Sequence, residues 1–163
     1  MTHDIHGRLD RHDGVRDLVV ERDLPVGVEE AWRWITESDR TAQWYGPWSG
    51  DGRVGGTIAL TMAAEEGAPT SPKVVASCER PRLLRIDSLP GEAFAIDITL
   101  EVLERDGGST VRLTHHEVGD TPGPADFGPG WEFYLGRLVA AVEDTQAPGF
   151  EDYLPLGDAY GAL

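Results

Sequence analysis

Basic residues, cysteine and long hydrophobic runs are all scarce in this chain of 163 residues. Its 14 lysines and arginines face 29 acidic side chains, and the net charge of -15 disfavours phosphate backbones and anionic membrane surfaces as partners. Cys78 is the only cysteine, so no disulfide can form within the chain, which agrees with a reducing compartment. No apolar run approaches the roughly 18 residues of a membrane span, and the first residues lack the apolar core of a signal peptide. We therefore expect a soluble, cytoplasmic protein that binds neither nucleic acid nor membrane.

The hydrophobic residues that are present suffice for one core. They make up 40% of the chain, and a chain of this length sustains a single core well. The pattern predicts a flexible leader over residues 1–14, one domain over residues 15–147 and a partly packed tail over residues 148–163. Terminal segments are ordered only where they dock, so we expect the first part of the tail to pack as a strap and residues from Gly157 onward to fray.

The order of the elements is more specific than the composition. Residues 15–24 are typical of a strand, which ends at Pro25. Over residues 28–35 apolar side chains then recur at three- and four-residue spacing, which indicates a short amphipathic helix. A second short helix follows, with Ser38 or Asp39 as its cap. Two short helices therefore interrupt the strand pattern after the first strand.

After a glycine-rich turn at residues 50–56 the pattern changes to strands. The clearest alternation of apolar and polar residues runs over 94–102, and a tight turn leads to a partner strand over 110–116. A helix of about 15 residues follows the FGPG segment at 127–130 and ends before Pro148. A sheet of about six or seven antiparallel strands has one apolar face, and this helix alone is long enough to cover it. The predicted fold class is α+β, with a curved antiparallel sheet wrapped around a long C-terminal helix.

Many signals that are weak on their own occur here in one order and spacing. They are Pro25, Val28, Ala31, Trp32, Thr36, Trp44, the turn over 52–56, Pro81, Leu83, Leu84, Gly108, Thr110, Leu113, Thr114, His115, Trp131, Leu135 and Leu138. Over roughly residues 15–145 this arrangement resembles the ATPase-activator-homologue branch of the START-related (SRPBCC) superfamily, named for a co-chaperone that activates the ninety-kilodalton heat-shock protein. The resemblance implies a helix-grip fold with a cavity between the sheet and the C-terminal helix. Across the superfamily that cavity holds lipids, sterols, polyketides, plant hormones or other apolar molecules.

Aromatic and apolar side chains from several predicted elements are expected to line such a cavity, because aromatic walls with few polar groups characterise small-molecule pockets. The predicted ligand-binding residues are Trp44, Trp48, Ile58, Leu60, Phe94, Ile96, Ile98, Leu113, His115, Trp131, Tyr134 and Leu135. Trp131 lies near the start of the predicted helix, beside the FGPG segment, where glycine and proline let the mouth adjust. Leu138 and Val142 lie further along the same stripe and are expected deep against the sheet.

His115 is the titratable residue of most interest, because strand alternation places it on the apolar side of its strand with Val111 and Leu113. A histidine there can orient a ligand carbonyl or act as an acid or base near neutral pH, with Tyr134 as its partner. It can equally have a structural role, with its ring nitrogens satisfied by backbone groups or water. His115 and Tyr134 are therefore the weak catalytic candidates of this chain.

Other motifs have structural interpretations. Gly50, Gly52 and Gly55 fit the pattern G-x-G-x-x-G, but a dinucleotide loop has to open a helix, whereas a strand pattern follows here, which favours a tight turn. The three histidines within residues 1–14 are irregularly spaced, and no paired cysteines occur, so we expect neither a metal site nor a cofactor. Cys78 is expected to be a small buried hydrophobic residue rather than a nucleophile.

Three functions remain open for this sequence. The first is a non-enzymatic module that binds an apolar or amphipathic small molecule in the cavity, and it is the function we expect. The second is an enzyme of the cyclase or dehydratase type that uses the same cavity, although few titratable side chains are predicted to face inward. The third is a co-chaperone-like domain whose acidic exterior docks on a basic partner surface. The sequence leaves both a homodimer and a chaperone partner open.

Overall fold

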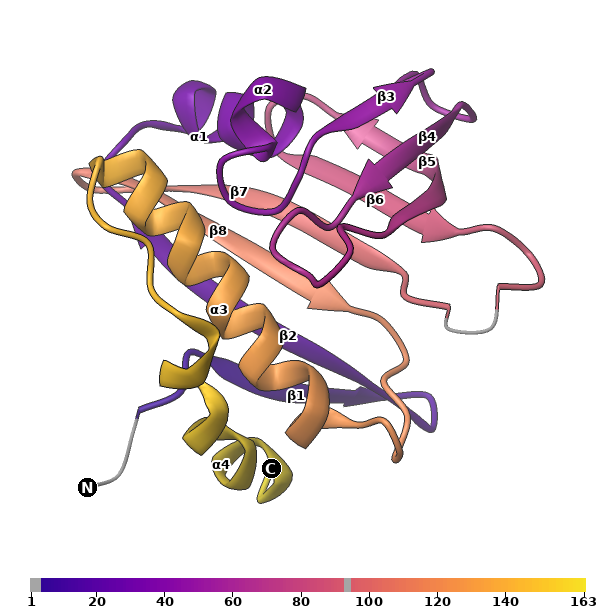
Figure 1. Cartoon of the computed structure of the whole chain (residues 1–163), viewed down its shortest axis with the longest axis vertical. Coiled ribbons are helices and arrows are strands. Elements are labelled where there is room, and N and C mark those ends of the chain that lie inside the picture. The colour runs from indigo at the N-terminus through magenta and orange to yellow at the C-terminus, as the bar shows by residue number, and fades with distance from the viewer. Residues whose placement is uncertain (1–3, 93–94) are drawn as a thin grey trace.

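A single antiparallel sheet of eight strands forms the centre of the fold (Figure 1). The computed structural model describes residues 4–92 and 95–163. In chain order the elements are β1 (Gly7–His12), β2 (Val15–Leu24), α1 (Val28–Thr36), α2 (Ser38–Thr41), β3 (Trp48–Gly50), β4 (Thr57–Thr61), β5 (Thr70–Glu79), β6 (Leu83–Ser88), β7 (Ile98–Arg105), β8 (Gly108–His115), α3 (Pro124–Glu143), two 3-10 turns η1 (Phe150–Asp152) and η2 (Leu154–Leu156), and α4 (Gly157–Gly161). The predicted α+β helix-grip fold is confirmed, with eight strands in place of about six or seven. Within the described part of the chain, no helix is long and apolar enough to span a membrane.

The strand order in the sheet is β1-β2-β8-β7-β6-β5-β4-β3. The first two strands lie at one edge, and the third strand of the chain, β3, lies at the opposite edge. After β2, the helices α1 and α2 carry the chain to the far edge of the sheet, where β3 begins a meander that leads strand by strand back to β8. β8 closes the sheet against β2, with Leu18 opposite His115 at one end and Leu24 opposite Ser109 at the other. The two short helices therefore connect β2, next to one edge of the sheet, with β3 at the other edge.

Strand β1 occupies residues 7–12, so the flexible leader predicted for residues 1–14 is wrong there. The two residues Asp13 and Gly14 join β1 to β2 as a hairpin, and both have a positive φ, 47° and 79°. A two-residue turn with this geometry matches the twist of paired strands, and Asp-Gly is a favoured sequence for it. Leu9 is the one large apolar residue of β1, so the strand shows no alternation of apolar and polar residues. In the sequence, the Asp-Gly turn alone indicates this strand.

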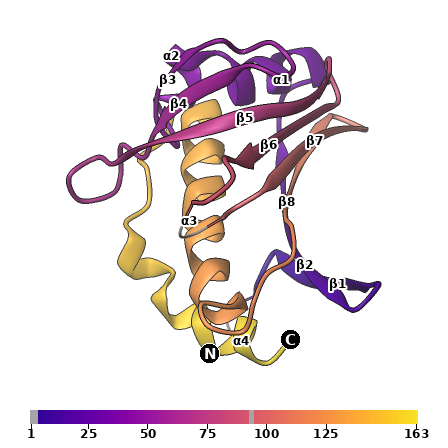
Figure 2. The same ribbon diagram turned by 90° about the vertical axis from the view of Figure 1, so that its right-hand side faces the viewer.

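The long helix α3 crosses the concave face of the sheet (Figure 2) and packs closest to β2. It begins at Pro124, so the FGPG segment at 127–130 lies inside the helix and not before it. Pro124 fits the first helical position, and the Asp126 carboxylate accepts a hydrogen bond from the backbone N–H of Gly123 at 2.8 Å. Pro129 lies in the second turn, where its missing N–H removes one backbone hydrogen bond. Good capping thus allows a helix where proline and glycine suggested a flexible segment.

The end of the tail packs against α3, so the fraying predicted from Gly157 is wrong. Tyr160 of α4 is fully buried and lies over Gly128 of α3, where a larger side chain would clash with the tyrosine ring. The Tyr160 hydroxyl donates a hydrogen bond to Glu132 at 2.6 Å, and the backbone N–H of His6 donates to the same carboxylate at 2.6 Å. Glu132 is 1% exposed. One buried carboxylate therefore ties segments near both ends of the chain to the long helix.

The first part of the tail packs less tightly than its end. Tyr153 contacts Gly136 of α3 through its hydroxyl, whereas Leu154 is 58% exposed. The strap predicted for this segment is therefore attached to α3 through an aromatic side chain rather than through its leucine.

Removal of the Tyr160 hydroxyl should loosen the tail. In Tyr160→Phe the buried Glu132 carboxylate loses a donor, so we expect the free energy of unfolding to fall by about 1–3 kcal/mol. Denaturant unfolding followed by circular dichroism measures this change. Tyr153→Phe is the matched control from the same tail and should change the free energy by less than about 0.5 kcal/mol. Equal changes in the two variants would contradict the role given to Glu132.

Candidate functional site

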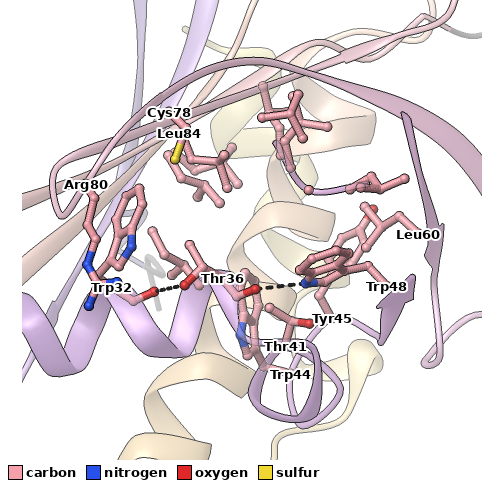
Figure 3. A pocket seen from close by; sticks show the side chains of 18 of the residues that line it. Trp32, Thr36, Thr41, Trp44, Tyr45, Trp48, Leu60, Cys78, Arg80 and Leu84 are labelled. Atoms are coloured by element: carbon pink, nitrogen blue, oxygen red, sulfur yellow. Dashed lines mark hydrogen bonds between the residues drawn. The ribbon is translucent and has the colours of Figure 1, made fainter. Parts of the chain in front are cut away.

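A cavity of about 270 Å³ lies between the inner face of the sheet and the helices α1 and α2 (Figure 3). The predicted position between the sheet and the C-terminal helix is therefore wrong, because among the described residues α3 contributes Trp131 alone to the lining. Its lining comes from both helices, the segment after α2, strands β3 to β8 with two of their connections, and one residue of α3. The lining residues are Trp32, Ile35, Thr36, Thr41, Trp44, Tyr45, Trp48, Gly52, Ile58, Leu60, Val75, Cys78, Arg80, Leu84, Ile86, Ile98, Leu100, Leu113 and Trp131. The volume is close to the lower end of the range of about 300–1,000 Å³ that is common for small-molecule pockets. The cavity can therefore admit a small molecule or one part of a larger one.

The floor of the cavity follows from the register of the strands. Leu84, Leu100 and Leu113 lie opposite one another on β6, β7 and β8, and all three line the cavity. On β5 a bulge directly after Val75 shifts the alternation by one residue, so Val75 and Cys78 share the cavity side. Cys78 is exposed, and so it lies at the mouth of the cavity. The expectation that Cys78 is a buried hydrophobic residue is therefore wrong.

Hydrogen bonds hold three of the indole rings that form the wall. Trp44 and Trp48 donate from Nε1 to backbone carbonyls of α1, at 2.9 and 2.8 Å (Figure 3 shows the second bond). Trp131 donates from Nε1 to Nδ1 of His115 at 3.1 Å. Because each of these N–H groups is used within the protein, the rings present apolar surface to the cavity.

His115 supports this wall from behind and does not line the cavity. It is 3% exposed, its Nδ1 accepts the hydrogen bond from Trp131, and its ring packs edge-on against Phe127 with 4.5 Å between the ring centres. Burial lowers the pKa of His115 to about 4. The ring is therefore neutral at pH 7, with its proton on Nε2, and it positions Trp131.

Tyr134 also lies one layer behind the wall. Its hydroxyl donates to Glu65 at 2.7 Å, and its ring centre is 4.6 Å from that of Tyr45. Burial and the hydrogen bond to Glu65 raise the pKa of Tyr134. Tyr45, which does line the cavity, has its pKa raised to about 12 by burial and by the charge of Glu65. The acid–base pair considered from the sequence, His115 and Tyr134, thus has neither member on the cavity wall.

Polar groups that could meet a ligand are few. The hydroxyl groups of Thr36 and Thr41 donate hydrogen bonds to backbone carbonyls of α1 and α2, respectively. The polar side chains that remain on the lining are Tyr45, Cys78 and Arg80. In residues 4–92 and 95–163, no group of three or more histidine, cysteine, aspartate or glutamate side chains is arranged to hold a metal ion. The lining thus offers an apolar surface with a small number of polar contacts.

The structure brings together seven of the predicted ligand-binding residues. The seven that line the cavity are Trp44, Trp48, Ile58, Leu60, Ile98, Leu113 and Trp131. The four that do not line it are Ile96, His115, Tyr134 and Leu135. Phe94 lies outside the described residues. Leu135 is fully buried in the core, and Ile96 precedes β7, which starts later than the alternation suggested.

Several lining residues were missed, each for a physical reason. Trp32 and Ile35 belong to the buried stripe of α1, but helical spacing does not show whether a buried face borders a core or a cavity. Val75 faces the cavity because of the bulge on its strand. Tyr45 and Arg80 lie in connections between elements, where no periodicity reveals the direction of a side chain.

One family model and several solved structures match the chain. The model described as Activator of Hsp90 ATPase homolog 1-like protein matches residues 25–143. Comparison of the sequence with curated proteins gives no match. Among solved structures, CalU16 from Micromonospora echinospora is similar, with a TM-score of 0.79 and 23% identity over 96% of each chain.

Two further solved structures have a similar fold. The Aha1 dimer from Colwellia psychrerythraea has a TM-score of 0.66 and 18% identity, over 78% of this chain and 96% of that one. DynU16, a protein of the dynemicin biosynthetic locus, has a TM-score of 0.68 and 22% identity, over 78% of this chain and 47% of that one. At these identities the likeness shows the fold alone.

The buried state of His115 should appear in the pH dependence of stability. The pKa of His115 is lowered from 6.5 to about 4 in the folded protein, so between these values the unfolded state binds more protons. Acidification from pH 7.5 to pH 5 should therefore lower the free energy of unfolding by about 2 kcal/mol through this residue.

The matched variant is His115→Asn, because an amide can accept the hydrogen bond from Trp131 but does not titrate. Denaturant unfolding of both proteins at the two pH values isolates this residue from the other titrating groups. The variant should lose about 2 kcal/mol less than the wild type on acidification. The same loss in both proteins would contradict a neutral, buried His115.

Proposed function

Because this chain belongs to the Activator of Hsp90 ATPase homolog 1-like family, whose model matches residues 25–143, we propose that it is a binding module. It holds an apolar or amphipathic small molecule in the cavity between the sheet and the helices α1 and α2, and it does not convert that molecule. The single observation that carries the proposal is the cavity, which is lined by indole rings and aliphatic side chains. In soluble proteins, concave apolar surfaces with few polar groups are typical of small-molecule sites.

The magnitudes agree with a role in binding. An apolar molecule gains about 25 cal/mol for each Å² removed from water, so a ligand that buries about 300 Å² of apolar surface gains roughly 7 kcal/mol. Association costs about 4 kcal/mol or more in lost freedom of movement. Hydrogen bonds already hold Trp44, Trp48 and Trp131 in place, so little further ordering of the wall is needed.

The enzyme alternative has less support. A cyclase or dehydratase needs an acid and a base within reach of the substrate. His115 is neutral and bonded to Trp131, and the Tyr134 hydroxyl is bonded to Glu65. Tyr45 lines the cavity but stays protonated at neutral pH, because its pKa is raised to about 12. A binding function therefore fits these groups better than acid–base catalysis.

The comparisons, rather than a binding surface in the structure, suggest two further roles, which are association with a chaperone and formation of a homodimer. The family description refers to an activator of the Hsp90 ATPase, and one similar structure is a dimer. The net charge of -15 would suit a basic partner surface. We treat a chaperone partner and a homodimer as alternatives to be separated by experiment.

Native mass spectrometry of freshly purified protein separates these roles. A mass increment of a few hundred daltons that is lost on denaturation supports a small ligand. A stoichiometric complex with a chaperone, with no small molecule bound, would overturn the proposal. A dimer without a small molecule would count against it in the same way.

Filling part of the cavity should weaken the binding of a neutral apolar probe. N-phenyl-1-naphthylamine, which becomes fluorescent in apolar surroundings, should bind the wild type. Leu60 lines the cavity and is half-buried, so Leu60→Trp adds volume at a position that tolerates change. We expect the dissociation constant to rise by about tenfold or more, which corresponds to roughly 1.4 kcal/mol.

The matched control is Leu154→Trp, which adds the same side chain at a position that is 58% exposed and does not line the cavity. Its dissociation constant should equal that of the wild type. Circular dichroism and denaturant unfolding confirm that both variants are folded. Unchanged probe affinity in Leu60→Trp would show that the probe binds elsewhere.

A further inference from the structure

Arg80 gives the cavity a polar end. It lies in the connection between β5 and β6, and it is one of the residues that line the cavity. Figure 3 shows Arg80 at one end of the cavity, with Trp48 and Leu60 at the other. A ligand that fills the cavity therefore has one end near a guanidinium group.

The sign of the charge at this end is unusual for the protein. The chain has 29 acidic and 14 basic residues, so its average surface repels anions. Among the described residues that line the cavity, Arg80 is the one with a basic side chain, and none has an acidic side chain. The mouth at Arg80 is therefore a local exception, where an anionic group would meet a cation.

Arg80 is available for such a group. Its present partner is Glu29, with 3.7 Å between the Nη2 and Oε2 atoms, and the two side chains are 70% and 72% exposed. A charge-assisted hydrogen bond between such groups has a length of about 2.7–2.9 Å, and exposed ion pairs of this kind contribute little to stability. A carboxylate on a bound ligand can take the place of Glu29 and accept two parallel hydrogen bonds from the guanidinium.

The rest of the lining indicates the shape of the ligand. Five aromatic residues border the cavity, and they are Trp32, Trp44, Tyr45, Trp48 and Trp131. Aromatic faces pack best against flat, apolar partners. One carboxylate neutralises the single guanidinium, whereas a doubly charged phosphate would leave an excess negative charge on a protein whose net charge is -15, so a carboxylate fits this end better.

Resting on the proposed binding function, we infer that Arg80 is a carboxylate subsite. The ligand is an amphipathic acid with a flat apolar body, which lies among the aromatic side chains, and a carboxylate, which pairs with Arg80 at the mouth.

A matched pair of probes tests this assignment. The probes are 4-(2-naphthyl)butanoate and 4-(2-naphthyl)butan-1-ol, which share the apolar body and differ in the terminal group. Isothermal titration calorimetry at low salt should show about tenfold tighter binding of the acid to the wild type. In Arg80→Gln this preference should disappear, while the affinity for the alcohol stays within about twofold of the wild type.

Two further variants serve as controls. Arg53→Gln removes an arginine that is 89% exposed, paired with Asp51 and not part of the lining, and it should keep the preference. Arg80→Lys keeps the charge but not the forked geometry, and it should keep part of the preference.

The outcomes separate this inference from the proposed function. A wild type that binds both probes equally, or an Arg80→Gln variant that still prefers the acid, would overturn the carboxylate subsite and leave the binding function intact. If neither probe binds and N-phenyl-1-naphthylamine also fails to bind, the binding function itself is wrong.

Discussion

The structure depends on how the concave face of an eight-stranded sheet is covered by one long helix. α3 has 20 residues and is therefore about 30 Å long, but a helix with its side chains is only about 10–12 Å wide. At a strand spacing of about 4.8 Å, that width covers two or three strands, and α3 packs closest to β2. The strands further along the sheet need a second cover, which α1, α2 and the aromatic residues after them supply. The cavity lies under this second cover.

Trp131 is the residue at which the two covers meet. It is carried by α3, it lines the cavity, and its indole N–H is held by His115 of β8. The lowered pKa of His115 follows from this position, because a charged ring in the core would lack solvation and its Nδ1 could not accept the hydrogen bond. A histidine in a helix-grip protein can therefore shape the cavity wall without touching the ligand.

The sequence predicts most of the fold, because the order of a strand, two short helices, further strands and a long helix is compatible with few arrangements. Strand alternation also places Leu113 on the cavity side. It does not show the bulge after Val75, which requires the register of the neighbouring strand. It does not show β1, whose side chains are mostly polar. An inward residue can pack into a core, as Leu135 does, or border a cavity. The positions of the helices decide between the two, and the spacing of apolar residues in the sequence does not show these positions.

The proposed function places a small apolar molecule in the space between α1, α2 and the sheet. Nuclear Overhauser contacts between N-phenyl-1-naphthylamine and the methyl groups of a selectively labelled sample test it most directly. We expect contacts with methyl groups of Ile58, Ile98 and Leu113, which line the cavity, and none with Leu154, which is exposed on the tail. Contacts confined to the tail, or a bound probe without contacts to the cavity methyl groups, would contradict it.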